Sequence, residues 1–111
     1  MGSKEKGDNL LDPVKVGVLG LGTVGGGTVN LLERNRDEIT RRAGRPIDVV
    51  RAAARHPDRP RTCSTENIQL DYDAYAVVDD PSIEIVVELI GGETLAKELI
   101  LRAIDNGKHV V

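Results

Sequence analysis

An apolar run at Val14–Leu19 leads directly into three glycines with the spacing Gly-x-Gly-x-x-Gly, at Gly20, Gly22 and Gly25. A segment with apolar residues at helical spacing follows them. A glycine triplet alone is weak evidence, but a triplet between a strand and a helix is the fingerprint of a dinucleotide-binding turn. The alternative is a glycine-rich strand-to-helix turn that binds no ligand.

Each glycine of this turn has a predicted physical role. Gly20 permits the tight turn that leaves the strand, and Gly22 lacks a Cβ, so that a pyrophosphate can approach the backbone closely. Gly25 allows the helix to pack tightly on the strand. The free N–H groups at the start of the helix, near Thr23 and Val24, are expected to face the phosphates together with the positive end of the helix dipole.

The rest of the chain alternates between predicted strands and predicted helices. Strands are expected at 14–19, 47–54, 83–90 and 109–111, helices at 23–43, 73–78 and 94–106, and an irregular loop at 56–70. This alternation predicts an α/β fold with a Rossmann-type, doubly wound parallel sheet. Right-handed crossovers place the strand over 83–90 beside the first strand, so Gly20–Gly25 and Ile90–Gly92 meet at the carboxyl edge of the sheet.

Composition and charge restrict the class of protein to which this chain can belong. The net charge of −3 over 111 residues is typical of a soluble protein and not of a nucleic-acid binder. No apolar run reaches the roughly 18 residues of a membrane span. Cys63 is the only cysteine, which excludes an internal disulfide and suits a reducing cytoplasm. We expect a disordered polar leader over 1–12 and a single domain over 13–111 that ends within a strand.

The residue at the end of the second strand indicates the cofactor type. NAD sites place an acidic residue there to hold the ribose 2′-hydroxyl, whereas NADP sites use a basic residue. The strand ends at Arg55, which can form charge-assisted hydrogen bonds to a 2′-phosphate. Asp48 lies too early in the strand and Asp58 lies beyond Pro57. The alternative for Arg55 is a solvated side chain at a strand end, so NADP and NAD both remain candidate cofactors.

Four segments together resemble homoserine dehydrogenase. They are Gly20-Leu-Gly-Thr-Val-Gly25, Ala76-Val-Val-Asp-Asp-Pro81, Val86-Val-Glu-Leu-Ile-Gly-Gly92 and Gly107-Lys-His-Val-Val111, in the order and at spacings similar to those of the family. The resemblance covers about residues 14–111. The Glu-Leu-Ile-Gly-Gly element is the most discriminating part, because many dehydrogenases share the first glycine motif.

The resemblance implies an activity for a longer protein. The family interconverts L-homoserine and L-aspartate 4-semialdehyde with NAD(P), in the biosynthesis of threonine, methionine and isoleucine, and its members are usually dimers or tetramers. In the family, a Thr-Ala-Asn-Lys segment and a substrate domain with the catalytic residues follow the motif that ends at Val111. We therefore expect a truncated, cofactor-binding fragment that is inactive alone, has no catalytic residue, and meets L-homoserine only within the full-length enzyme.

The resemblance also implies three groups of cofactor contacts. These are Leu21, Thr23 and Val24 at the pyrophosphate, Arg55 near the adenosine ribose, and Ile90, Gly91 and Gly92 towards the nicotinamide half. Thr94 is a further candidate that is equally explained as a helix cap. Glu88, within an apolar strand, is either a satisfied buried carboxylate or faces a groove. No metal site is expected.

Two other interpretations remain open at this point. One is the NADP-binding domain of a glucose–fructose oxidoreductase-type dehydrogenase, a family that also ends a helix with Gly-Lys-His-Val. That family usually has a proline-containing motif after the strand that corresponds to 83–90, where this chain has Gly91 and Gly92. The other interpretation is a non-catalytic module that senses nucleotides.

Overall fold

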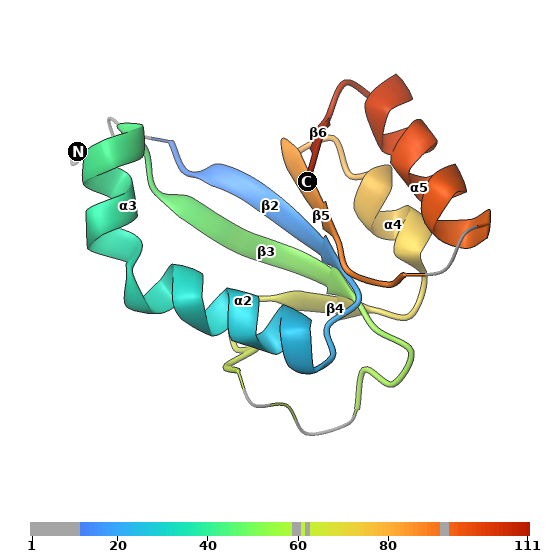
Figure 1. Cartoon of the computed structure of the whole chain (residues 1–111), viewed down its shortest axis with the longest axis horizontal. Helices are drawn as coiled ribbons and strands as arrows, with labels where there is room; N and C mark the ends of the chain where they lie inside the picture. Colours follow the sequence, from blue (N-terminus) through green and yellow to red (C-terminus); the bar gives the residue numbers. More distant parts are fainter. Residues whose placement is uncertain (1–11, 59–60, 62, 92–93) are drawn as a thin grey trace.

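Five parallel strands form the central sheet of the computed structural model, which describes residues 12–58, 61, 63–91 and 94–111. The strands are β2 (Val14–Leu19), β3 (Ile47–Ala53), β4 (Gln69–Asp71), β5 (Ile85–Glu88) and β6 (His109–Val110). The helices are α2 (Thr23–Arg34), α3 (Arg36–Ala43), α4 (Ala74–Val78) and α5 (Thr94–Asp105). The order across the sheet is β4-β3-β2-β5-β6, which confirms the predicted doubly wound α/β fold (Figure 1).

The sheet has a hydrophobic core on each face. Val16 and Val18 of β2 pack on the face covered by α2, in a cluster that includes Val29. Leu19, which follows Val18 and so points the opposite way, packs in a second cluster with α4 and α5. Because β2 is covered on both sides, it requires the near-continuous apolar run seen in the sequence.

Gly17 explains how α4 comes so close to the sheet. A Cβ at Gly17 would lie 2.5 Å from Cγ1 of Val77 and 2.9 Å from Cδ1 of Ile83. Val77 and Ile83 are both at least 98% buried, with relative exposures of 0% and 2%. The absent side chain at Gly17 therefore leaves the space that α4 and the following turn occupy.

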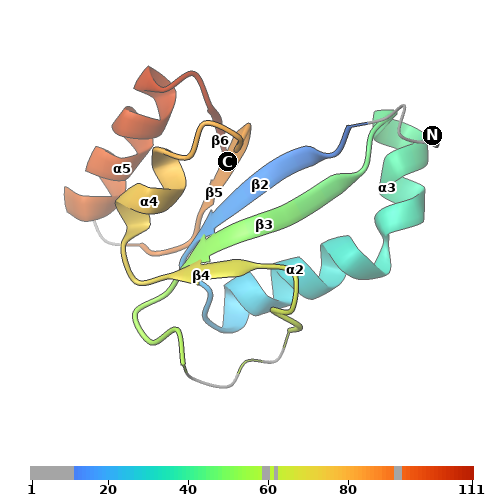
Figure 2. The ribbon, with the colours of Figure 1, turned by 180° about the vertical axis from the view of Figure 1, so that it is seen from behind.

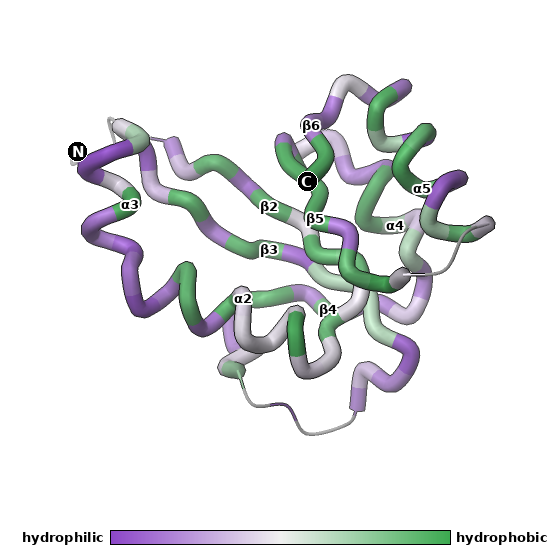
Figure 3. Tube along the Cα trace, viewed as in Figure 1, coloured by the Kyte–Doolittle hydropathy of each residue, from purple (hydrophilic) through white to green (hydrophobic). Residues whose placement is uncertain are grey.

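The prediction of one continuous helix over 23–43 is wrong, because the helix breaks at Asn35. The Asn35 side chain donates a hydrogen bond from Nδ2 to the carbonyl of Leu31 at 3.0 Å, and Asn35 has φ −105° and ψ 20°. Such side-chain bonds compete with helix continuation. Beyond the break α3 is hydrophilic and turns away from the axis of α2, where Arg36 forms an ion pair with Asp48 of β3 (Figures 1 and 3).

The prediction of an irregular loop over 56–70 is wrong at its end, where β4 begins. Gln69 pairs with Arg51 of β3, so β4 adds a short strand at the sheet edge (Figure 2). An ion pair reinforces the pairing, since Nε of Arg51 lies 2.6 Å from Oδ2 of Asp71. The strand expected over 83–90 is also shorter than predicted, and β5 spans only Ile85–Glu88.

Two features concern the part of the chain that the structure describes. It contains no helix long and apolar enough to cross a membrane. It contains no group of three or more His, Cys, Asp or Glu residues arranged to hold a metal ion. Cys63 is a free, buried cysteine in the cluster beneath α2.

Candidate functional site

The carboxyl ends of β2, β3 and β5 meet at one edge of the sheet. Leu19 pairs with Ala53 on one side and with Glu88 on the other. The chain leaves β2 towards β3 and later crosses to β5, so this edge lies where the strand order reverses. Open α/β sheets bind their ligands at such a switch point.

A cleft of about 840 Å³ opens at this edge. Its volume lies within the roughly 300–1,000 Å³ of small-molecule sites. Among the described residues, its lining comprises the glycine loop at 20–25, residues 53–56, Arg61, residues 72–75, Leu89, Ile90 and Leu95. The loops that follow β2, β3, β4 and β5 therefore all contribute to one cleft.

The glycine loop has the geometry that its spacing predicts. Gly20 has φ +97°, which an L side chain rarely adopts and which turns the chain out of β2. A Cβ on Gly25 would lie 2.4 Å from the carbonyl oxygen of Gly20, so only glycine allows α2 to approach the strand end this closely. A Cβ on Gly22 would meet no protein atom within 4 Å. Gly22 thus borders open space in the cleft.

The first turn of α2 presents backbone donors to the cleft. Gly22 is the N-cap and makes no side-chain capping bond, and the first turn contains no acidic residue. The N–H groups of the first helical residues, Thr23, Val24 and Gly25, have no partner within the helix. Thr23 and Val24 are exposed and line the cleft. This end of α2 therefore favours an anionic group through its N–H donors and its dipole.

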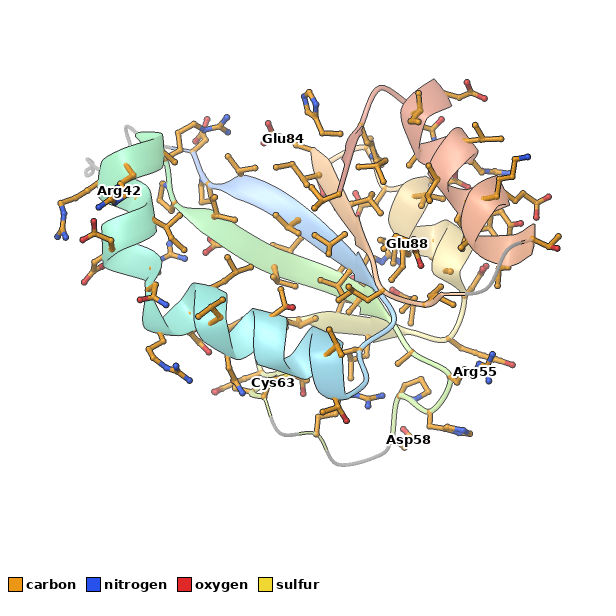
Figure 4. All side chains as sticks on the ribbon, in the orientation of Figure 1. Arg42, Arg55, Asp58, Cys63, Glu84 and Glu88 are labelled. Carbon is orange, nitrogen blue, oxygen red and sulfur yellow. The ribbon has the colours of Figure 1, made fainter. Side chains whose placement is uncertain are left out.

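Arg55 is exposed at the end of β3 and lines the cleft (Figure 4). Within the described residues its guanidinium forms no hydrogen bond or ion pair, so its donors are available to a ligand. Asp48 lies at the opposite end of β3, where it pairs with Arg36. Asp58 is exposed on the loop after β3 and is not among the residues that line the cleft.

The turn after β5 is held by Glu88, whose environment is closer to the predicted satisfied carboxylate than to a residue that faces the cleft. Glu88 is half-buried, and its Oε2 accepts a hydrogen bond from the backbone N–H of Gly91 at 2.9 Å. Gly91 has φ +76°, so this bond stabilises a left-handed turn that favours glycine. The carboxylate therefore shapes the backbone that carries Ile90 to the cleft.

The remaining candidate residues after β5 are placed as follows. Ile90 lines the cleft, whereas Gly91 and Thr94 are not among its lining residues. Thr94 is the exposed first residue of α5, and the next residue, Leu95, lines the cleft instead. Gly92 lies outside the described residues.

Sequence reasoning missed several residues that line the cleft. Arg61 donates from Nη1 to the carbonyl of Leu21 at 3.1 Å and from Nη2 to the carbonyl of His56 at 2.6 Å. Tyr72 and Tyr75 follow β4, the strand that the sequence did not reveal. Recognition of a third strand before Tyr72 would have placed both tyrosines at the carboxyl edge of the sheet.

Tyr75 has a fixed orientation beside the cleft. Its hydroxyl donates a hydrogen bond to Oε1 of Glu98 at 2.6 Å, and this bond to a carboxylate raises the pKa of Tyr75 above its usual value. The Arg102 guanidinium lies over the Tyr75 ring, 5.1 Å from its centroid. Tyr75 therefore remains a neutral, amphipathic wall of the cleft at physiological pH.

Fold and cleft together define a class of protein. A Rossmann-type nucleotide-binding domain has a parallel sheet whose strand order reverses, with a Gly-x-Gly-x-x-Gly turn after the first strand. This chain has both features, and a cleft lies over the glycine turn and the uncapped start of α2. Comparison with known proteins is consistent with this class. Residues 20–111 match the family model described as "Homoserine dehydrogenase, NAD binding domain", and the chain belongs to that family.

Relatives with known names support the same assignment. Homoserine dehydrogenases of Pseudomonas aeruginosa and Methylobacillus glycogenes are 59% and 56% identical over 101 residues, which are 91% of this chain and 23% and 24% of theirs. The crystal structure of a homoserine dehydrogenase from Thiobacillus denitrificans matches with a TM-score of 0.81 at 56% identity, over 90% of this chain and 23% of that one. The chain thus spans about a quarter of the length of these relatives.

Proposed function

We propose that residues 13–111 form the cofactor-binding domain of an NAD(P)-dependent homoserine dehydrogenase. The reaction of the full-length enzyme is then the interconversion of L-homoserine and L-aspartate 4-semialdehyde. The observation that supports this proposal most strongly is the coincidence of the family's glycine motif with a cleft at the switch point of the sheet. The family match favours this function over the glucose–fructose oxidoreductase type and over a module that only senses nucleotides.

The proposed task of this chain is to bind and orient the cofactor. Nicotinamide cofactors supply the hydride chemistry themselves, and the protein supplies binding and orientation. In the proposal, Leu21, Thr23 and Val24 hold the pyrophosphate through backbone N–H groups at the start of α2. Ile90 and Gly91 are proposed contacts of the nicotinamide half, and resemblance to the family adds Gly92 and Thr94. No catalytic residue is assigned within this chain.

We propose NADP as the preferred ligand, with Arg55 as the residue that binds its 2′-phosphate. Arg55 is unpaired within the described residues, it lines the cleft, and no acidic residue occupies the end of β3. A guanidinium matches the geometry of a phosphate and forms paired hydrogen bonds with it. NAD binding would then rest on the parts that the two cofactors share, without the contact from Arg55 to a 2′-phosphate.

Two further properties of the full-length protein are proposals that rest on the family. Its members are usually homo-oligomers, and we expect the same of the protein that contains this domain. A cytoplasmic location agrees with a free, buried cysteine and with the absence of a membrane-spanning helix among the described residues.

Isothermal titration calorimetry of the 111-residue chain with NADP, NAD and inorganic pyrophosphate tests the proposed function. We expect saturable binding of both dinucleotides, with NADP the tighter ligand, and weaker binding of pyrophosphate. If a chain with an intact circular dichroism spectrum bound neither NADP nor NAD, the proposal would be contradicted.

A further inference from the structure

Arg61 joins two segments of the cleft that are far apart in the sequence. Its guanidinium donates to the carbonyl of Leu21 in the glycine loop and to the carbonyl of His56, next to Arg55. The last ladder bond between β2 and β3 in this region is that from the N–H of Gly20 to the carbonyl of Ala53, at 2.9 Å. The two bonds of Arg61 extend the connection between the β2 and β3 segments beyond the ends of the strands.

The surroundings of Arg61 indicate that its position is fixed. Leu21 is only 2% exposed and its side chain packs in the core beneath α2, which restrains the backbone that carries the accepting carbonyl. Nε of Arg61 is buried and has no hydrogen-bond partner among the described residues. Desolvating this donor costs free energy, which the two bonds to carbonyl groups must offset.

We propose that Arg61 is a positioning residue that sets the spacing between the pyrophosphate turn and the Arg55 segment. This inference rests on the proposed function of the cleft. Its consequence differs from that of Arg55, because the pyrophosphate and adenosine are common to NAD and NADP. Loss of Arg61 therefore weakens both ligands, NADP at least as much as NAD, whereas loss of a 2′-phosphate contact weakens NADP alone.

The guanidinium is needed because it reaches two acceptors at once. Its planar fork presents separate N–H donors to the two carbonyls, whereas the single ammonium of lysine is a compact donor on a flexible stem. A lysine at position 61 can retain one of the two bonds. Arg61→Lys is therefore expected to keep part of the effect, and Arg61→Met, which keeps most of the apolar stem, is expected to lose all of it.

Dissociation constants of the 111-residue chain for NADP and for NAD provide the first test. We expect Arg61→Met to weaken both by roughly tenfold, because nucleotide binding must then restore a spacing that the bonds of this charged donor hold in the unaltered chain. Arg61→Lys should be intermediate. Arg42→Met is the matched control, since Arg42 is exposed on α3 and outside the cleft lining, and its affinities should equal those of the unaltered chain. Unchanged affinities, or a loss confined to NADP, would overturn the inference.

Hydrogen exchange without nucleotide provides a second, independent test. Arg61→Met should increase the exchange rates of amides in residues 20–25 and 55–58, while amides in β2 and β5 keep their rates. Equal rates in both proteins would overturn the positioning role even if nucleotides bind. Conversely, faster exchange in a chain that binds no dinucleotide would support the role of Arg61 while contradicting the proposed function. Thermal unfolding by circular dichroism verifies that each variant is folded.

Discussion

Arg55 is the side chain on which the choice between the two cofactors depends. It lies at the carboxyl end of β3, it is exposed, and it lines the cleft. No described residue at this strand end carries a carboxylate: Asp48 is paired with Arg36 at the opposite end of the strand, and Asp73, which lines the cleft after β4, caps α4. A free cation at this place has a stronger preference for a phosphate than for a hydroxyl group.

We expect Arg55→Ala to weaken NADP binding much more than NAD binding. Loss of one charged hydrogen-bonded contact costs about 1.5–3 kcal/mol, or roughly one to two decades in affinity. Titration of both nucleotides against the unaltered chain and the variant gives the two ratios, with Arg42→Ala as the control. Equal losses for the two nucleotides would show that Arg55 does not bind the 2′-phosphate.

Gly17 is a second residue with a consequence that can be measured. Its missing side chain admits Val77 of α4, since a Cβ would lie 2.5 Å from Cγ1 of that valine. We expect Gly17→Ala to lower the free energy of unfolding by about 1–3 kcal/mol, the usual cost of overpacking a core. Urea unfolding measures this change.

The matched control for Gly17→Ala is Gly27→Ala. A Cβ at Gly27 meets nothing within 4 Å, and Gly27 lies within α2, where alanine is favoured over glycine by up to about 1 kcal/mol. The control should therefore leave stability unchanged or raise it slightly. A Gly17→Ala chain as stable as the control would contradict the packing argument.

At the scale of elements, Asp79 joins α4 to α5. Its Oδ1 and Oδ2 accept hydrogen bonds from Arg102 at 2.7 Å each, and Oδ1 also accepts one from Nδ2 of Asn106 at 3.0 Å. The bond with Arg102 lowers the pKa of Asp79 below its ordinary value of 3.8 and outweighs the opposing effect of burial. The neighbouring Lys108 is buried and donates to the carbonyls of Asp80 and Ile83, which fixes the start of β6.

The lowered pKa of Asp79 predicts a pH dependence of stability. A carboxyl group whose pKa is lower in the folded state stabilises the fold above the unfolded value of 3.8, and this contribution is lost as the pH falls through the folded pKa. We expect Asp79→Asn to reduce the slope of unfolding free energy against pH below about pH 4. Urea titrations across this range measure the slope, and an unchanged slope would contradict the assignment.

The elements that could be predicted from the sequence are those with a strong local signal. The β2 run, the glycine turn, and the helix stops at Gly44 and Gly107, both with positive φ, follow from hydrophobic periodicity and backbone freedom. The break at Asn35 could not be predicted, because the apolar spacing continues across it and the side-chain bond to Leu31 found there has no sequence pattern. β4 was missed because three residues at a sheet edge give no period.

The parts of the cleft that follow predicted strands could also be predicted from the sequence. Its glycine loop and Arg55 follow strand ends that the sequence reveals, so topology alone brings them together. Arg61 was missed because it lies in a loop, and its hydrogen bond to Leu21 spans 40 residues. Tyr72 was missed along with β4. Contacts that depend on the path of a long loop have no local pattern from which to infer them.

At the scale of the whole molecule, the matching domain makes up only part of each relative's chain. The chain spans about a quarter of the length of the homoserine dehydrogenases that it matches. We expect the 111-residue chain to bind nucleotide without oxidising L-homoserine, because the proposed activity requires the substrate-binding region of the full-length enzyme. Reduction of NADP followed by absorbance measures this, and turnover above that of a mock-purified sample would contradict the division of function.

The central claim is that the glycine loop binds the dinucleotide, and Gly22 tests it most directly. Gly22 and Gly27 both have open space where a Cβ would stand, but only Gly22 lines the cleft. We therefore predict that calorimetric titration with NADP will show no measurable binding by Gly22→Val and unaltered binding by Gly27→Val, with both chains retaining their helical circular dichroism. Unaltered NADP affinity in a folded Gly22→Val chain would contradict the account.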